Sequence, residues 1–390
     1  MQETTYDAIV VGARCAGAGT ALQLARSGLS VLVLDRAPRT GDTLSTHALL
    51  RAGVLQLDRW GLLDRVIAAG TPPIRRSTFH LVDEDIPVSI KPLRGVDAFY
   101  APRRSVIDTI LAEAAAEAGA EVLLGARVLD LVDDGERVRG VSALDPDGRP
   151  FTARARVVVG ADGRDSTVAA SVGAAVDRVA RAASTVVYGY VSGLPADGYE
   201  WWFRRGRSAG LIPTNGGKLC LFAAGRAEEL SGGPPAQVLT EAVVRVAPEL
   251  ADGLAAAGPA RGIRRYAGAP GYFRTPWGPG WALVGDAGYL KDPITAHGMT
   301  DALRDSELLA SAILAAAGGT PEADAYGEYH ATRDRLSVPL FDVAEQLASH
   351  AWSDEEVRLL LLELSSAMTD EVEHLLGAEP LGASTISAVA

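Results

Sequence analysis

The segment Ala8-Ile-Val-Val-Gly-Ala-Arg-Cys-Ala-Gly17 decides the fold, together with the residues that follow it as far as Asp35. Ala8–Val11 is a short run of mostly β-branched residues, which predicts a buried strand. The helical spacing of 16–27 and the apolar run 30–34 predict a helix and then a second strand. Strand, helix and strand in succession form a βαβ unit, which builds a parallel sheet through a right-handed crossover. The sequence therefore predicts an α/β fold with a Rossmann-like parallel sheet.

The turn of this βαβ unit has the pattern of a dinucleotide site. Gly12 and Gly17 flank the turn into the helix, and Asp35 ends the second strand. A tight glycine turn lets amides at a helix N-terminus face a pyrophosphate, while the carboxylate binds the adenosine ribose. Arg14 stands where the usual pattern has its second glycine. We therefore expect the Arg14 side chain to point away from the pyrophosphate or alongside it.

Later segments extend the sheet and then change character. An Ala-rich helix is expected over 106–119, and Asp-Gly turns at 134–135 and 147–148 predict a three-stranded meander that rejoins the sheet at 157–160. After Ala174 the short strands alternate with turns, which is typical of an antiparallel sheet. The expected strands are 121–124, 127–132, 138–141, 152–159, 185–191, 199–203, 210–213, 219–223, 266–275 and 281–284, and the later helices are 236–247, 300–317, 322–349 and 354–376.

The composition limits the possible functions. The net charge of −12 over 390 residues disfavours nucleic-acid binding, because such proteins carry a basic surface. Cys15 and Cys220 are too few for a disulfide framework or a zinc cage, so we expect a reducing compartment and no metal centre. The polar segment 1–7 does not fit a secretory signal, and no uninterrupted stretch of about 18 apolar residues exists. We therefore expect a cytoplasmic protein without a membrane span.

Two further motifs specify the nucleotide. The apolar run 157–159 leads into Gly160-Ala-Asp162-Gly163, and 281–284 leads into Gly285-Asp286, followed by Asp292-Pro293 and Ala296-His-Gly298-Met. With three such motifs in this order, the chain resembles FAD-dependent monooxygenases of the para-hydroxybenzoate hydroxylase type. Their relatives, the flavin-dependent halogenases and geranylgeranyl reductases, share the same motifs. The resemblance covers most of residues 5–320.

The resemblance implies non-covalent FAD and assigns its contacts. The segment 51–55 would run beside the ribityl chain, Arg104 would meet the phosphates, and Asp286 would bind a ribityl hydroxyl. Amides near His297 and Met299, at the start of a helix, would face the flavin pyrimidine and stabilise its reduced anion. The expected cofactor residues are Gly12, Arg14, Cys15, Ala16, Gly17, Asp35, Arg36, Arg51, Arg104, Val128, Asp162, Gly285, Asp286, Gly298 and Met299.

Three residues are candidates for catalysis, and a discontinuous domain organisation follows from the motifs. Pro293 would shape the loop on the face of the flavin ring, while His47 and His297 could relay a proton, because an unperturbed histidine pKa is about 6.5. A structural hydrogen bond is the alternative for both histidines.

The expected domains are an FAD-binding domain (1–75, 100–175 and 275–320), a substrate domain (76–100 and 176–274) and C-terminal helices (321–390).

The resemblance implies a monooxygenase that uses NAD(P)H and O₂ and acts through a flavin C4a-hydroperoxide. An apolar, aromatic insert around Trp201 and Trp202 favours a bulky, hydrophobic, natural-product-like substrate. No second glycine-rich βαβ unit is present, so NAD(P)H would bind transiently, or a separate flavin reductase would supply electrons. The alternatives are a reductase or dehydrogenase of an isoprenoid or polyketide double bond, a halogenase, and FAD as a structural ligand of a regulatory protein. The halogenase needs a reactive lysine, and none of Lys91, Lys218 and Lys291 lies in that family's lysine context.

Overall fold

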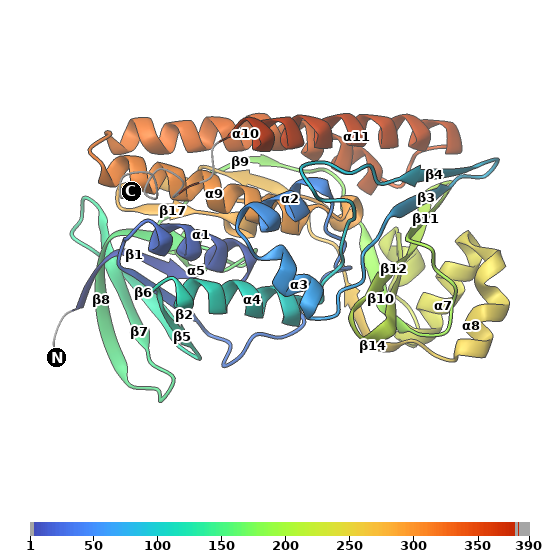
Figure 1. Ribbon diagram of the computed structural model, residues 1–390, viewed down its shortest axis with the longest axis horizontal. Coiled ribbons are helices and arrows are strands. Elements are labelled where there is room, and N and C mark those ends of the chain that lie inside the picture. Colours follow the sequence, from blue (N-terminus) through green and yellow to red (C-terminus); the bar gives the residue numbers. More distant parts are fainter. Residues whose placement is uncertain (1–3, 379–380, 382–390) are drawn as a thin grey trace.

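Two large sheets, a small three-stranded sheet and a layer of three long helices dominate the fold. The structure, a computed structural model, describes residues 4–378 and 381, so the outermost residues of the predicted N-terminal and C-terminal ranges lie outside the described residues. Figure 1 shows the larger sheet at the left, the second sheet at the right, and the helices α9 (Gly298–Ala317), α10 (Glu322–Ala348) and α11 (Asp354–Gly377) along the top. The three helices thus cover both large sheets: α9 packs on the eight-stranded sheet, and α10 and α11 pack on the seven-stranded sheet.

The eight-stranded sheet is the predicted Rossmann-like sheet. Its central strand β1 pairs in parallel with β2 on one side and β8 on the other, and β6 and β7 form the predicted meander with β8. The path through the sheet is β16 (Trp277–Gly278), β17 (Trp281–Leu283), β8 (Pro150–Gly160), β1 (Thr4–Val11), β2 (Val31–Asp35) and β5 (Glu121–Leu124), with β6 (Arg127–Asp133) and β7 (Val138–Leu144) beside it.

Alternation along β1 explains the layers around this sheet. Ala8 and Val10 belong to the core shared with α1 (Cys15–Arg26), α4 (Arg104–Glu117) and α9, whereas Ile9 and Val11 face the meander. Successive strand residues point to opposite faces, so a continuous apolar run buries both faces at once. Three short helices complete this part of the chain, namely α2 (Arg51–Arg59), α3 (Leu63–Ala68) and α5 (Thr167–Ser171).

The seven-stranded sheet lies between two sets of helices. Val187 and Leu221 pack toward α7 (Pro235–Val246) and α8 (Ala251–Ala257), while Tyr188 and Phe222 belong to a core with α10 and α11. The strand order is β14 (Arg261–Tyr266), β10 (Thr185–Val191), β13 (Lys218–Gly225), β12 (Arg207–Thr214), β11 (Tyr199–Arg204), β3 (Arg76–His80) and β4 (Asp85–Ser89), and α6 (Ala227–Leu230) precedes α7. The domain boundaries drawn from the sequence stay a prediction.

The continuous strand expected over 266–275 was wrong. β14 ends at Tyr266 in the seven-stranded sheet, and β15 (Tyr272–Arg274) pairs instead with β9 (Val176–Val179) and β18 (Tyr289–Leu290) in a separate three-stranded sheet. The intervening 267–271 contains two glycines and a proline, which break the extended run. The chain crosses between sheets at this point.

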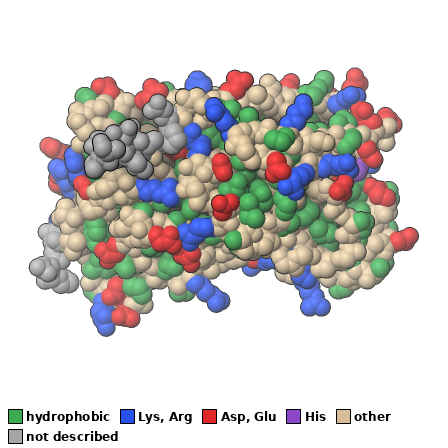
Figure 2. Space-filling model, viewed as in Figure 1, with side chains coloured by type: hydrophobic (Ala, Val, Ile, Leu, Met, Phe, Trp, Pro, Cys, Tyr) green, Lys and Arg blue, Asp and Glu red, His purple; other side chains and the backbone are tan. Residues whose placement is uncertain are grey.

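The surface carries both signs of charge. On the face drawn in Figure 2, acidic and basic side chains are interspersed and hydrophobic side chains gather near the middle of the view. Such a mixture differs from the single-sign basic stripe of a nucleic-acid-binding protein. Within residues 4–378, each helix is too short or too polar to cross a bilayer.

The packing of α10 on the seven-stranded sheet can be tested with two leucines. Leu340 on α10 is 0% exposed, and Leu359 on α11 is 57% exposed. We expect Leu340→Ala to lower the free energy of unfolding by about 2–5 kcal/mol, because it leaves a cavity in the core. Leu359→Ala, the control, should change it by less than about 0.5 kcal/mol. Denaturant unfolding followed by circular dichroism measures both, and equal midpoints would contradict the assigned packing.

Candidate functional site

Three glycine motifs meet at one edge of the eight-stranded sheet. Val11 at the end of β1 and Leu283 at the end of β17 are both register partners of Gly160 at the end of β8. These are the carboxyl ends of three adjacent parallel strands, which is where ligands bind in open α/β sheets. Segments separated by more than a hundred residues thus build one candidate site.

Glycine is required at this junction because backbones approach closely. A Cβ on Gly12, whose φ is 109°, would lie 2.4 Å from the carbonyl oxygen of Ala161. A Cβ on Gly17 would lie 1.9 Å from the carbonyl oxygen of Gly12, and one on Gly285 would lie 2.7 Å from the Ala16 Cβ. The first motif therefore packs directly against both others.

The start of α1 is suited to bind an anion. Arg14 is exposed and occupies the N-cap without a capping side-chain hydrogen bond, so the positive end of the helix dipole faces outward. The Cys15 amide and thiol both donate to Asp108 at 3.2 Å, which makes Cys15 a buried structural residue. Asp35 accepts hydrogen bonds from the amides of Ala13 and Ala37, and these bonds hold its carboxylate beside the glycine turn.

Asp286 and Arg104 lie on the same side of the sheet. Asp286 is exposed at the surface. Desolvation by the surrounding chain raises the pKa of its carboxyl, and the positive charge of Arg104 acts to lower that pKa. Arg104 forms an ion pair of 3.0 Å with Asp108, which also binds Cys15. Asp286, Arg104 and the start of α1 thus lie near one another, linked by the charge of Arg104 and by Asp108.

Three other expected cofactor residues are Asp162, Arg36 and Val128. Asp162 accepts hydrogen bonds from the Ser166 hydroxyl and the Thr167 amide, so its carboxylate closes its own turn. Arg36 is exposed beside Asp35, and Val128 is half-buried on β6. Their roles toward a cofactor stay predictions.

The Arg51 side chain is directed away from the expected ribityl position. Its guanidinium donates to the carbonyl oxygens of Lys91 at 2.7 Å and Val96 at 3.3 Å, and it lies over the Phe99 ring. These contacts hold the loop 91–99 against α2. Arg51 therefore acts here as a tether for that loop, and a contact to a cofactor stays a prediction for its backbone alone.

His47 lies between the two sheets and has no exposed surface. Its Nε2 is 2.5 Å from the Tyr190 hydroxyl, and the Arg103 guanidinium stacks on the Tyr190 ring while pairing with Asp42. Burial lowers the pKa of His47 to about 3, far below the unperturbed value of about 6.5, and a role in proton transfer stays a prediction. His47 is neutral, has a left-handed backbone (φ 71°), and its buried Nδ1 has no partner.

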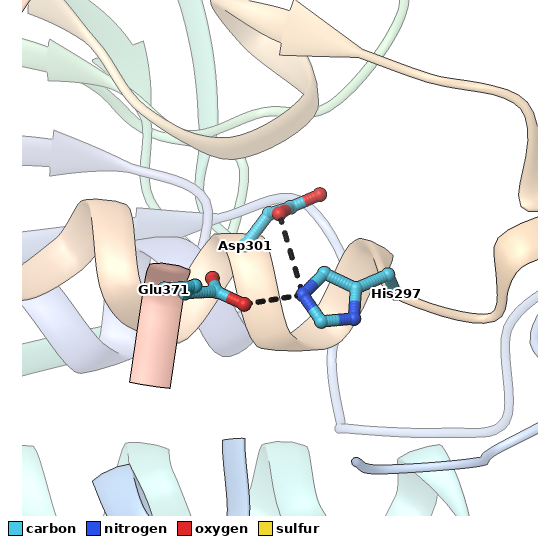
Figure 3. Close-up of side chains that lie close together, drawn as sticks. All are labelled: His297, Asp301 and Glu371. Carbon is cyan, nitrogen blue, oxygen red and sulfur yellow. Dashed lines mark hydrogen bonds and ion pairs between the residues drawn. The ribbon is translucent and has the colours of Figure 1, made fainter. Parts of the chain in front are cut away.

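His297 faces away from the glycine turn and into a buried ion cluster. Its Nε2 lies 2.5 Å from Glu371 of α11, as Figure 3 shows, and 4.0 Å from Asp301. Burial lowers the pKa of His297. We define the buried ion cluster as Lys291, His297, Asp301, Arg304 and Glu371. The geometry favours the structural hydrogen bond over the proton relay for His297.

The trio drawn in Figure 3 has the residue types of a metal site, but its charges are already balanced. Lys291 pairs with Asp301, and Arg304 lies 3.3 Å from Asp301 and 3.0 Å from Glu371. Two cations beside the same carboxylates would repel a metal ion. The group is therefore explained as an ion-pair cluster.

The Pro293 loop connects the start of α9 with the seven-stranded sheet. Asp292 accepts hydrogen bonds from the Ser184 amide at 2.6 Å and from the Ile294 amide at 3.0 Å. Pro293 itself is exposed, and Gly298 begins α9. The loop is thus fixed at both ends, with the exposed Gly298 and the buried Met299 in the first helical turn.

Aromatic side chains line the inner face of the seven-stranded sheet beside this loop. Ile294 and Ala296 pack against that face, so it adjoins the Pro293 loop directly. The Trp201 and Phe222 rings meet edge to face at 5.8 Å. The aromatic face consists of Tyr188, Tyr190, Tyr199, Trp201, Phe203 and Phe222.

The sequence interpretation missed three residues that shape the site. Tyr190 and Arg103 hold His47, and Glu371 holds His297. Arg103 stands next to the expected phosphate residue Arg104, which is a signal that could have drawn attention to it. Glu371 lies 74 positions beyond His297, and nothing in the local pattern of its helix distinguishes it.

Comparisons with known proteins agree with this geometry. The family described as FAD binding domain matches residues 5–344. Digeranylgeranylglycerophospholipid reductase 1 of Methanococcoides burtonii is 28% identical over 334 residues, which is 80% of this chain and 75% of that protein. Protein FixC of Salmonella typhi is 34% identical over 242 residues, 60% of this chain, and the match spans only 52% of FixC.

Solved structures share the whole fold. The flavin-dependent brominase Bmp2 superposes with a TM-score of 0.76 at 21% identity, covering 97% of this chain and 94% of that chain. PqsL of Pseudomonas aeruginosa, a probable FAD-dependent monooxygenase, gives a TM-score of 0.76 at 22% identity, covering 94% of this chain and 100% of that chain. At these identities the likeness shows the fold.

The glycine junction gives a direct test of cofactor binding. Gly17→Ala places a methyl group against the Gly12 carbonyl, so α1 must shift away from the turn, and we expect the protein to lose most of its bound FAD. Gly327→Ala, in α10 with open space around the position, should leave FAD bound. The ratio of flavin to protein absorbance measures both. A Gly17→Ala protein as yellow as the wild type would refute the assignment.

Proposed function

This chain belongs to the FAD binding domain family of flavin-dependent oxidoreductases, and we propose that it is a monooxygenase of a bulky, hydrophobic, aromatic substrate. The observation that carries the proposal is the contact between the aromatic face and the Pro293 loop. Most of this face is buried against α10 and α11, so a substrate would lie at its edge beside the Pro293 loop, next to the start of α9, where the family resemblance places the flavin ring. Apolar walls with a few polar groups are typical of small-molecule sites.

The described residues fit FAD at both ends of the candidate site. The glycine turn and the uncapped start of α1 would hold the pyrophosphate, Asp35 the ribose, and Asp286 a ribityl hydroxyl. At the other end, Thr295 Oγ1 and His47 Nδ1 are buried and have no hydrogen-bond partner among residues 4–378, as expected for groups that complete their bonds with a ligand. Bound FAD would supply electron transfer and oxygen activation, while the chain binds, orients and excludes water.

His47 and Tyr190 are the pair we propose for proton movement. Burial raises the pKa of Tyr190, so its phenol keeps its proton and can donate to His47 Nε2. The ring proton then resides on Nδ1, which points to no protein partner. If the Tyr190 hydroxyl takes up a proton from water as it gives its own to Nε2, and Nδ1 releases a proton in the same step, the proton moves on and neither side chain becomes charged.

The source of electrons is proposed to be NAD(P)H that binds transiently, or a separate flavin reductase. Within the described part of the chain, β1, α1 and β2 form the one βαβ unit that carries the glycine pattern, and the proposed FAD occupies it. A cytoplasmic location is part of this proposal, because Cys15 and Cys220 are buried free thiols.

A second candidate function is reduction of an isoprenoid or polyketide double bond. The match to a digeranylgeranylglycerophospholipid reductase over 80% of this chain favours it. The same aromatic face would accommodate an isoprenoid chain. The two candidates differ in whether O₂ contributes an atom to the product.

The halogenase alternative is disfavoured by the positions of the lysines. Lys291 is buried and paired with Asp301 in the ion cluster. Lys218 is exposed in a turn, where it donates to Ser192, and Lys91 is exposed in the loop held by Arg51. None of the three lies on the aromatic face, where a halogenase would need one.

The proposed reaction is tested by the fate of oxygen. The purified protein is incubated with NADPH, isotope-labelled O₂ and a panel of hydroxylated naphthoquinones and anthraquinones, with geranylgeranyl lipids as a parallel set. We expect the label in a hydroxylated aromatic product. Formation of an unlabelled, saturated lipid in the absence of O₂ would contradict the monooxygenase proposal and support the reductase.

The His47–Tyr190 pair predicts a defect in coupling. His47→Asn keeps a residue that tolerates the left-handed backbone but removes the imidazole. We expect FAD to stay bound while NAD(P)H consumption yields more H₂O₂ and less product. His330→Asn on α10, a partly exposed histidine paired with Asp334, is the control. Because the pKa of His47 is about 3, we expect the same coupling loss at every pH between 6 and 9. Full product yield per NAD(P)H would remove His47 from the proposed role.

A further inference from the structure

The C-terminal helix α11 reaches a functional position although the family match ends before it. The match covers residues 5–344, and α11 spans Asp354–Gly377. Most acidic residues of α11 are exposed, whereas Glu371 is 1% exposed and points toward the first turns of α9. Figure 1 shows α11 running back along α10 above α9. A buried carboxylate at this place needs an explanation, because burial of a charge is unfavourable unless it is paired.

Glu371 holds two residues of α9 at once. One carboxylate oxygen lies 2.5 Å from His297 Nε2, at the N-cap of α9, and the other lies 3.0 Å from an Arg304 nitrogen, two turns further along. Arg304 also binds Asp305 and Ser337 of α10. The carboxylate thus bridges the beginning of α9 to the helix pair that covers it.

The charges around this bridge make the Glu371 carboxylate hard to replace. Two buried basic side chains, Lys291 and Arg304, pair with three carboxyl groups, those of Asp301, Asp305 and Glu371. Burial acts to raise the pKa of Glu371, but the hydrogen bond with His297 and the positive charge of Arg304 outweigh it and hold the pKa below its usual range, so the carboxyl is ionised at neutral pH. Removing one partner from a buried ionic group leaves an uncompensated charge, which is strongly destabilising locally.

A small cavity beside Glu371 indicates how the cluster would respond to its loss. The cavity has a volume of about 70 Å³ and lies between α2, α9 and α11, away from the glycine turn. Thr300, Arg304, Glu371 and His374 are among its lining residues. Truncation of Glu371 would enlarge this cavity and open the cluster to water, so the first turns of α9 would lose their fixed partner.

We propose that Glu371 is a positioning residue that fixes the first two turns of α9, and with them the amides of Gly298 and Met299 that face the flavin pyrimidine. The proposal rests on the proposed function for the identity of the ring that these amides face. It adds a residue outside the family match to the flavin site. Glu371 does not touch the ring; it acts through His297 and Arg304.

Three variants test the proposal: Glu371→Ala, Glu371→Gln and the control Glu363→Ala on the exposed side of α11. We expect Glu371→Ala to weaken FAD binding at least tenfold and to speed hydrogen exchange at the amides of 298–301. Glu371→Gln, which keeps the volume but not the charge, should weaken binding less. Its flavin reduction potential should shift to a more positive value, because a negative charge near the reduced, anionic form is removed.

The outcomes separate positioning from general stability. A merely structural role would lower the melting temperature without shifting the reduction potential or the exchange rates at 298–301, and that result would overturn the proposal. FAD affinity and exchange equal to those of Glu363→Ala would overturn it as well. If Glu371→Ala does not fold, the decision rests on Glu371→Gln by the same criteria. A wild-type protein that binds no FAD would refute the proposed function, whereas the exchange rates would still test the bridge from Glu371 to α9.

Discussion

The close approach of Gly12 to the backbone of Ala161 is the constraint on which the candidate site depends. A side chain at Gly12 would separate β1 from the end of β8, and the start of α1 would move with it. Gly285 adds the same constraint from the end of β17, because it packs against Ala16. Three strand ends can therefore meet only if these positions carry no Cβ. The anion-binding turn, Asp35 and Asp286 all take their positions from this contact.

The seven-stranded sheet contributes aromatic side chains, rather than charged groups, to the candidate site. Its inner face is aromatic, and Asp292 ties the Pro293 loop to the residue before β10 through the Ser184 amide. The His47–Tyr190 pair joins the same sheet to the segment that precedes α2. Each contact joins a loop to β10 or to the residue just before it. These two hydrogen bonds thus fix the segment before α2 and the Pro293 loop against the seven-stranded sheet, which α10 and α11 cover.

Local patterns predicted most of the elements, while long-range contacts decided the roles of individual side chains. The βαβ unit, the meander and the long helices follow from periodicity and glycine turns, because these signals span few residues. Periodicity does not tell where a side chain points once three elements meet. It could not show that the Arg51 side chain, expected at the cofactor, binds the loop 91–99, or that His297, a candidate proton relay, binds Glu371. Burial is the largest cause of the lowered pKa of His47, and burial is a property of the assembled fold.

The order of strands in the eight-stranded sheet bears on how the protein is made. β17 pairs with β8, and β8 with β1, although β1 begins at Thr4 and β17 at Trp281. A ribosome releases the N-terminal strands first. On the side of β8 away from β1, β7 pairs with residues 150–154, but residues 158–160 have no neighbour until β17, in the last third of the chain, emerges. Exposed edges of this kind can pair with other chains. Newly made protein therefore passes through a stage at which a chaperone, or an early-bound nucleotide at the glycine turn, would protect it from aggregation.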